Sequence, residues 1–126
     1  MKHFTMNELT RSSTAKRNNI NNTPTSDVAE KLEQLVCSVL DPAREMFGKA
    51  IRVNSGFRSS ELNRKVGGAA GSQHMRGEAV DLTTGTRSEN QKLFELIRDN
   101  FEFDQLINEK DFSWVHVSYR EGNNRM

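Results

Sequence analysis

Three side chains able to ligate a metal lie in two short segments of the second half of the chain. His74 and Asp81 fall within the segment 72–81, and His116 lies in the run Trp-Val-His-Val-Ser at 114–118. Imidazole and carboxylate are good ligands for Zn²⁺, and a catalytic zinc takes three protein ligands while one position stays open for water. These residue types in this pattern indicate a site that could hold zinc and activate water.

Each of these residues also has a plainer interpretation. A histidine in a strand is more often packed or at the surface than bound to metal, and Asp81 alone could be a strand-end or turn carboxylate. His116 alternates with Val115 and Val117, so it should point to the opposite face of its strand from the valines. His3 is the remaining histidine and lies in a polar segment. Residue types and spacing alone therefore leave both interpretations open.

The main helix should begin after Pro24. Apolar residues recur there at steps of three and four, which predicts one helical face made of Val28, Leu32, Leu35, Val36, Val39, Ala43 and Met46. Asp27 followed by Glu30 suits its N-terminal cap. Pro42 lies inside the pattern and predicts a kink or a restart, and Gly48 fits as the end of the helix.

Four strands and a second helix should position the candidate ligands. Alternating or apolar runs predict strands around 51–53, 78–82, 105–108 and 114–119, with one helical turn at 61–66. Ser88 with Gln91 predicts a capping box for a helix carrying Leu93, Phe94, Leu96 and Ile97. The segment 1–25 is mostly polar and predicts an arm that wraps the rest, with a loop at 18–22. Helices separated from an antiparallel hairpin predict an α+β fold, and 126 residues fit one domain.

Composition excludes several classes of function. The chain carries 18 basic and 17 acidic residues, a formal charge of +1, which provides no sustained field for binding nucleic acid. Cys37 is the only cysteine, so an intramolecular disulfide and an all-cysteine zinc site are excluded. The N-terminus lacks the apolar region of a signal peptide, and no apolar run is long enough to span a membrane. We expect a monomer that is cytoplasmic when made.

Three motifs in order resemble the M15 family of zinc D-Ala-D-Ala peptidases. They are SGFRS at 55–59, SxHxxGxAxD at 72–81 and Trp-Val-His at 114–116. The sequences ELTRSSTAK at 8–16 and LDPAR at 40–44 are similar to phage-borne and prophage-borne members of the M15A branch. The resemblance implies the fold shared with the hedgehog signalling domain, a small antiparallel sheet with helices packed on one side.

The resemblance also implies roles for individual residues. His74, Asp81 and His116 would be the zinc ligands. Arg58 would bind the terminal carboxylate of a peptidoglycan stem peptide or polarise the scissile carbonyl, a task suited to the guanidinium fork. Its alternative interpretation is a surface arginine in a turn. Ser72 and Gln73 would line the peptide cleft, although Ser72 could equally be a turn residue alone.

The general base departs from the family pattern. Many members have an acidic residue three positions before the last histidine, and this chain has Ser113 there. Glu109 and Asp111 are the candidates, and Glu109 is preferred because the phage-like and hedgehog-like branches place the acid at the end of the preceding strand. That carboxylate would take a proton from the attacking water and pass it to the leaving amine.

Two hypotheses arise from these residues. The chain is either a zinc peptidase that cuts stem peptides, as a carboxypeptidase or as an endopeptidase, or a non-catalytic zinc-containing cell-wall or virion binding module. Arg58 beside three ligands favours the peptidase, because a structural zinc does not require a carboxylate-binding arginine. The serine at position 113 favours the module. Either protein would act on the cell wall, after phage lysis or as a virion component.

Overall fold

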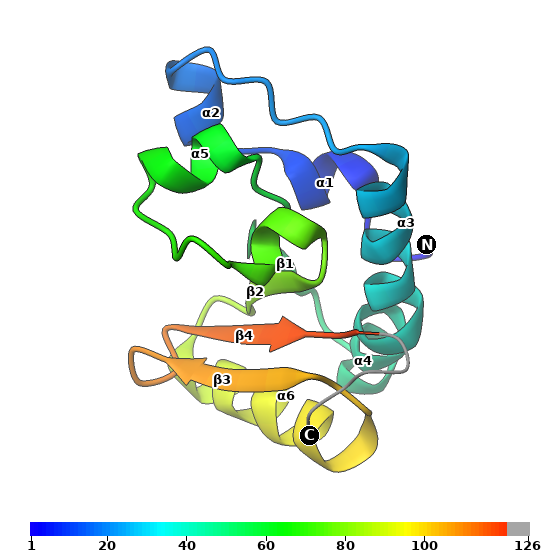
Figure 1. Cartoon of the computed structure of the whole chain (residues 1–126). Helices are drawn as coiled ribbons and strands as arrows, with labels where there is room; N and C mark the ends of the chain where they lie inside the picture. The colour runs from blue at the N-terminus through cyan, green and yellow to red at the C-terminus, as the bar shows by residue number, and fades with distance from the viewer. Residues whose placement is uncertain (121–126) are drawn as a thin grey trace.

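The structure is a computed structural model that describes residues 1–120, with a four-stranded antiparallel sheet among the helices (Figure 1). In chain order the elements are α1 (Met6–Thr10), α2 (Ser13–Arg17), α3 (Ser26–Leu35), η1 (Val36–Leu40), α4 (Asp41–Phe47), β1 (Arg52–Ser55), α5 (Ser60–Lys65), η2 (Gln73–Arg76), β2 (Ala79–Thr83), α6 (Arg87–Asn100), β3 (Gln105–Glu109) and β4 (Trp114–Ser118). The strand bounds lie within about two residues of those predicted from alternation. The α+β class predicted from the sequence is confirmed.

The sheet has the order β1-β2-β4-β3, and every neighbouring pair is antiparallel. Val80 and Leu82 pair with Val117 and Val115, and all four are fully buried. Because strand residues alternate between faces, these side chains share one face and Asp81 lies on the other. The sheet thus separates an apolar face from a face that carries polar chemistry.

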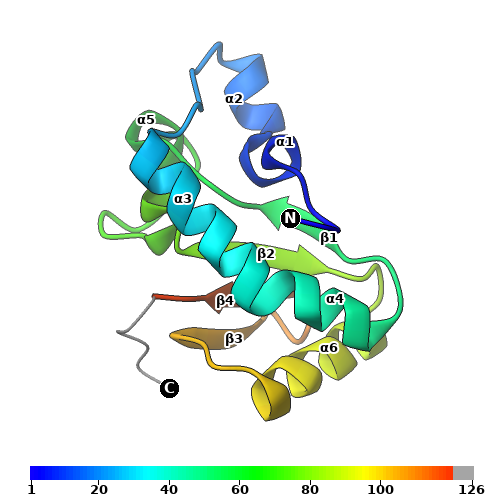
Figure 2. The same cartoon turned by 90° about the vertical axis from the view of Figure 1, so that its right-hand side faces the viewer.

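Helices cover the apolar face. Figure 2 shows the long helix formed by α3, η1 and α4 crossing the sheet, with α6 beside β3. Leu32 and Leu35 of the long helix and Leu93 and Ile97 of α6 join the buried cluster with the strand valines. Burying each of these side chains contributes about 1.5–3 kcal/mol to folding. This one-sided helical layer matches the fold expected from the resemblance.

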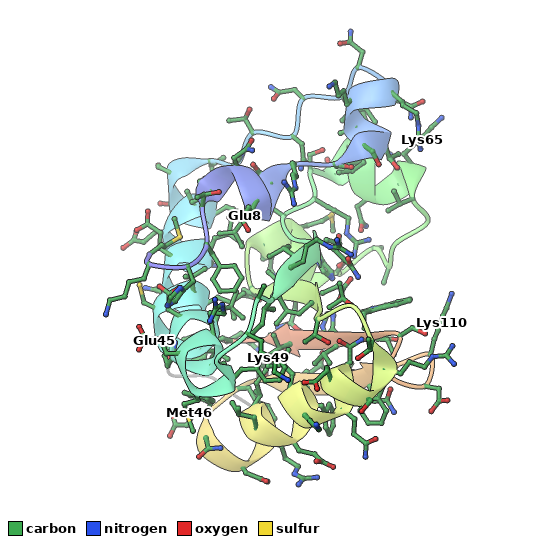
Figure 3. The ribbon with its side chains drawn as sticks, turned by 180° about the vertical axis from the view of Figure 1, so that it is seen from behind. Glu8, Glu45, Met46, Lys49, Lys65 and Lys110 are labelled. Carbon is green, nitrogen blue, oxygen red and sulfur yellow. The ribbon has the colours of Figure 1, made fainter. Side chains whose placement is uncertain are left out.

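The long helix differs from its prediction in two places. Thr25 caps it by accepting a hydrogen bond from the backbone N–H of Val28, so the predicted cap at Asp27 is wrong. Met46 is exposed, although the pattern placed it on the buried face (Figure 3). The reason is η1, a π-helical turn that contains an additional residue and so rotates the next helical turn about the axis. The helix continues through Pro42 and ends at Gly48, which has φ 76°.

The second long helix also begins at a different cap. Thr86 accepts from the backbone N–H of Glu89, so α6 starts before Ser88 and the predicted box of Ser88 with Gln91 is wrong. Asn90 of this helix donates to the carbonyls of Phe112 and Ser113. It therefore holds the turn between β3 and β4 against the end of the sheet.

The N-terminal arm contains two short helices that the sequence did not predict. It forms the short helices α1 and α2, capped by the Thr5 and Ser12 side chains. Leu9 is fully buried, and the backbone N–H groups of Lys2 and His3 donate to the Asp41 carboxylate. The predicted loop at 18–22 lies outside both helices, after the end of α2 at Arg17. Within residues 1–120 we find no helix with the length and apolar content that crossing a membrane requires.

Candidate metal centre

The pairing of β2 with β4 places two of the predicted ligands side by side. Asp81 and His116 are direct partners in the register. Both side chains lie on the face opposite the buried valines. His116 Nδ1 is 2.9 Å from Asp81 Oδ1. The backbone ladder of the central strands thus fixes the spacing of these two donors.

The third donor comes from the turn η2, which precedes β2. Ser72 caps this turn by accepting from the backbone N–H of His74 at 3.2 Å. Gly77 ends it with φ 73°, and a Cβ at this position would lie 2.6 Å from the carbonyl oxygen of Val28. Only glycine suits that combination of conformation and close approach. The turn holds the His74 side chain, which is 3% exposed, over the sheet.

The hydrogen bonding of His74 selects which ring nitrogen faces the site. Its Nδ1 lies 2.8 Å from the carbonyl oxygen of Gly56, which can only accept, so Nδ1 carries the proton. The other ring nitrogen, Nε2, faces the site and lies 3.4 Å from Asp81 Oδ2. Histidine ligands commonly donate their second N–H to a carbonyl in this way, which orients the ring.

The three donors lie close enough together to share one metal ion. One ligand atom from each of His74, Asp81 and His116 lies within 4.8 Å of the other two. Ligands of a tetrahedral zinc with bonds of about 2.0–2.1 Å are separated by about 3.4 Å, the distance between His74 Nε2 and Asp81 Oδ2. His116 Nδ1 lies closer, 2.9 Å from the other oxygen of the same carboxylate. Two imidazoles and one carboxylate also match the donor set of catalytic zinc sites. These residues form the candidate metal site.

The electrostatics of the cluster keep Asp81 ionised. Burial by itself would raise the pKa of the Asp81 carboxyl, but hydrogen bonds from His116 and His74 and the charges on these rings lower that pKa to about 2. A metal ligand has to be deprotonated, and a depressed carboxyl pKa meets that requirement without a large energetic cost.

Arg58 lies beside this cluster. Its backbone N–H donates to the carbonyl of His74 at 3.1 Å, and its Nη1 donates to Asn63 Oδ1 at 3.3 Å. The Nε atom is buried and makes no hydrogen bond within residues 1–120. Burial lowers the pKa of the Arg58 guanidinium, and the charge of Asp81 opposes that shift. The group remains a cation and a multiple donor next to the metal site.

Ser72 and Gln73 occupy different surroundings. Ser72 is half-buried and caps η2, so the structure gives it the turn function that the sequence left open. Gln73 is 8% exposed, and its Nε2 donates to Asp104 Oδ2 at 2.7 Å and to Glu78 Oε1 at 3.4 Å. Gln73 therefore ties the turn to the start of β3, and its predicted contact with substrate stays a prediction.

The two candidate bases lie at the hairpin of β3 and β4. Glu109 is the register partner of Trp114, two residues before His116, so it lies on the same face of the sheet as His116. Such diagonal neighbours are about 7–8 Å apart. Asp111 is exposed in the turn with φ 56°. Within the described residues, no hydrogen bond or ion pair joins either acid to His74, Asp81 or His116.

A cleft of about 760 Å³ opens at the metal site. Asp81, Arg58 and Trp114 line one part of it, and Ser12 and Thr14 of the N-terminal arm line another. The cleft is formed jointly by the polar face of the sheet, the loop after β1 and the arm.

Sequence reasoning missed the residues that connect the arm to this cleft. Asn22 donates to the carbonyls of Thr10 and Phe57 and accepts from the backbone N–H of Ser59. Its position in the polar run 18–22 indicated a loop, and no local pattern distinguishes a structural asparagine from a solvated one. Gly56 belongs to the motif at 55–59, and its close packing against Leu9 requires the folded arm.

Comparisons with known proteins agree on one family. A family model described as Peptidase M15 matches residues 2–118 of the chain. A zinc D-Ala-D-Ala carboxypeptidase from Streptomyces albus G is 52% identical over 42 residues, which are 33% of this chain and 16% of that protein. The match to this relative therefore spans about a sixth of its length. The family model, in contrast, extends over the arm, the sheet and all three candidate ligands.

Proposed function

Because this chain belongs to the peptidase M15 family, we propose that it is a zinc peptidase that hydrolyses peptidoglycan stem peptides at or near D-Ala-D-Ala. The observation that carries the proposal is the cluster of two imidazoles and a carboxylate whose Asp81 lines the same cleft as the half-buried Arg58. The similarity of 42 residues to a zinc D-Ala-D-Ala carboxypeptidase supports the substrate class.

The metal would be held by three donors: Nε2 of His74, Nδ1 of His116 and the carboxylate of Asp81. When bound, zinc supplies a Lewis acid for a carbonyl oxygen and lowers the pKa of a coordinated water. Gly56 fixes the ring of His74 through the hydrogen bond to its carbonyl, and the sheet register fixes the other two donors. The chain therefore presents its donors in a preorganised arrangement.

Arg58 would bind the substrate. Its guanidinium has donors left over beyond the bond to Asn63, and a carboxylate or a developing oxyanion can accept them. A terminal carboxylate bound there would favour removal of the last residue, and a scissile carbonyl bound there would suit internal cleavage. Asn63 orients the guanidinium by accepting from Nη1.

Glu109 would act as the general base and then as the acid for the leaving amine. Its place at the end of β3, on the face of His116, supports this role. Asp111 is the second candidate. The non-catalytic binding module remains the alternative function, favoured by Ser113, whose hydroxyl donates to the carbonyl of Lys110 at the position where many relatives carry an acid.

The test combines zinc analysis with hydrolysis of purified muropeptides. We expect about one zinc per chain and release of D-Ala or a shortened peptide. Arg58→Ala should keep zinc and fold but lose about a hundredfold or more in rate. Arg64→Ala is the matched control, because Arg64 is exposed on α5 and does not line the cleft. Zinc binding without cleavage of any muropeptide would favour the binding module.

A further inference from the structure

The cleft extends well beyond the metal site. Besides Asp81, Trp114 and Arg58, residues of α2 and of the segment before it line the cleft, among them Arg11 and Lys16. The charged side chains that line it are three cations, Arg11, Lys16 and Arg58, and a single anion, Asp81. Asp81 belongs to the metal site, so the far part of the cleft carries positive charge alone.

The two arm cations lack an ionic partner in the part of the chain that the structure describes. Within residues 1–120, neither Arg11 nor Lys16 takes part in an ion pair, and both side chains are exposed. Several other lysines are paired, since Lys31 lies 3.6 Å from Glu78 and Lys49 lies 3.1 Å from Glu89. The charges of Arg11 and Lys16 are therefore available to a bound anion.

The arm that carries these cations is fixed relative to the metal site. The backbone N–H of Phe57 donates to the carbonyl of Leu9 at 2.7 Å. The neighbouring Gly56 carbonyl accepts from His74 Nδ1. Asn22, near the end of the arm, donates one further hydrogen bond to the carbonyl of Phe57. A chain of direct contacts therefore joins Leu9, two residues before Arg11, to a metal ligand.

We propose that Arg11 and Lys16 form a second anion subsite, which binds a carboxylate of the substrate peptide several residues away from the scissile bond. The inference rests on the proposed function for the identity of the peptide. A stem peptide with a free α-carboxylate on its γ-linked D-glutamate has this chemistry, whereas the amidated form, with a carboxamide there, does not. The chain thereby discriminates in favour of the acidic form.

The charge at the subsite sets the size of the effect. An exposed ion pair contributes a modest free energy, so two cations together should favour the carboxylate form about fivefold to tenfold at low salt. The preference should fall as ionic strength rises, because exposed charges are screened. Lys16→Arg should preserve it, since the charge is retained.

Trp114 provides a direct measurement of binding. It is the only tryptophan in the chain and lines the cleft, so its fluorescence reports occupancy. The probes are two synthetic peptides, L-Ala-γ-D-Glu-L-Lys-D-Ala-D-Ala with a free α-carboxylate on glutamate or with a carboxamide there. The scissile amide in both is replaced by a methyleneamine, so that binding is measured without turnover.

We expect the zinc-loaded wild type to bind the carboxylate peptide about fivefold to tenfold more tightly. The double variant Arg11→Ala, Lys16→Ala should bind both peptides equally while its zinc content and thermal unfolding stay unchanged. Arg17→Ala is the matched control: Arg17 is an exposed cation on the same helix that does not line the cleft, and this variant should keep the preference.

Equal binding of both peptides by the wild type, no binding of either, or a preference that survives the double variant would overturn the subsite. Failure of the proposed function looks different. If no muropeptide is cleaved but the carboxylate preference and its loss in the double variant are observed, the peptidase proposal fails and the anion subsite stands. If both unmodified peptides are cleaved with the same kcat/KM, the peptidase stands and the subsite fails.

Discussion

The two sides of the candidate metal centre are built in different ways. On the sheet side, Asp81 and His116 are held by the continuous backbone ladder of β2 and β4. On the loop side, His74 and Arg58 depend on a few specific contacts, among them the Gly56 carbonyl and the N-terminal arm. Many repeated backbone hydrogen bonds therefore fix the positions of the side chains on the sheet side, whereas single contacts fix those on the loop side.

This difference explains why glycine and asparagine matter at particular positions of the loop side. Gly56 has room for no side chain, because a Cβ there would lie 2.1 Å from the carbonyl oxygen of Leu9. Asn22 satisfies three backbone groups of the arm and the loop after β1. Substitutions on the loop side should therefore impair the site by displacing His74 and Arg58. Substitutions on the sheet side should impair it by altering the ligands themselves.

Removal of a ligand should have the largest effect, and the loss of stability should differ between the loop side and the sheet side. His74→Ala and His116→Ala should each lose zinc and peptidase activity, measured by metal analysis and muropeptide cleavage. In zinc-free protein, His74→Ala should lower the free energy of unfolding by about 1–3 kcal/mol more than His116→Ala, because it leaves the Gly56 carbonyl without its donor. Equal destabilisation by the two variants would contradict the distinction between the sides.

Gly56→Ala should damage the loop side without touching a ligand. The added methyl would overlap the Leu9 backbone, so we expect a loss of about 3 kcal/mol or more in the free energy of unfolding, or failure to fold. Gly71→Ala is the control, because nothing lies within 4 Å of a Cβ there, and it should change stability by less than about 0.5 kcal/mol. Denaturant titration of both variants measures the difference.

The base should affect the rate without affecting the metal. Glu109→Gln is expected to keep zinc and lose about a hundredfold in rate on muropeptides, since a positioned general acid and base contributes about that much. Asp111→Asn should be milder, because Asp111 is exposed in the hairpin turn. A reversed order in kcat would move the base to Asp111 and leave the rest of the mechanism in place.

The sequence predicted the sheet side better than the loop side, and the reason is physical. Alternation is a local signal, so the strands around Asp81 and His116 were placed within about two residues. The helices of the arm have five residues each, too few for periodicity to reveal. Met46 was misplaced because the π-helical turn η1 shifts the phase of the helix, which no repeat of three and four residues predicts.

The local sequence pattern did not predict the helix caps or the contacts between segments distant in the chain. Several residues near each helix start could cap it, and the structure shows that Thr25 and Thr86 do so, each with an extended backbone. The three motifs point to the candidate metal donors, and the two histidines among them belong to a residue type that is rare in this chain, with three in all. The connection of the arm to the site depends on pairs of residues far apart in sequence, which a single sequence does not reveal.

The smallest expected effect tests that connection directly. Asn22→Ala removes two donated hydrogen bonds and one accepted bond at part-buried positions, so the free energy of unfolding should fall by about 2 kcal/mol. Asn21→Ala is the adjacent control, since the Asn21 side chain accepts one exposed hydrogen bond from Thr23, and it should change stability by less than about 0.5 kcal/mol.

The same two variants should also differ in substrate binding. Asn22 positions the loop that carries Arg58 and does not touch the ligands, so zinc content should stay unchanged in both variants. KM for muropeptides should rise in Asn22→Ala alone. A variant that loses stability but keeps the wild-type KM would mean that the arm supports the fold and leaves the position of Arg58 to the sheet side.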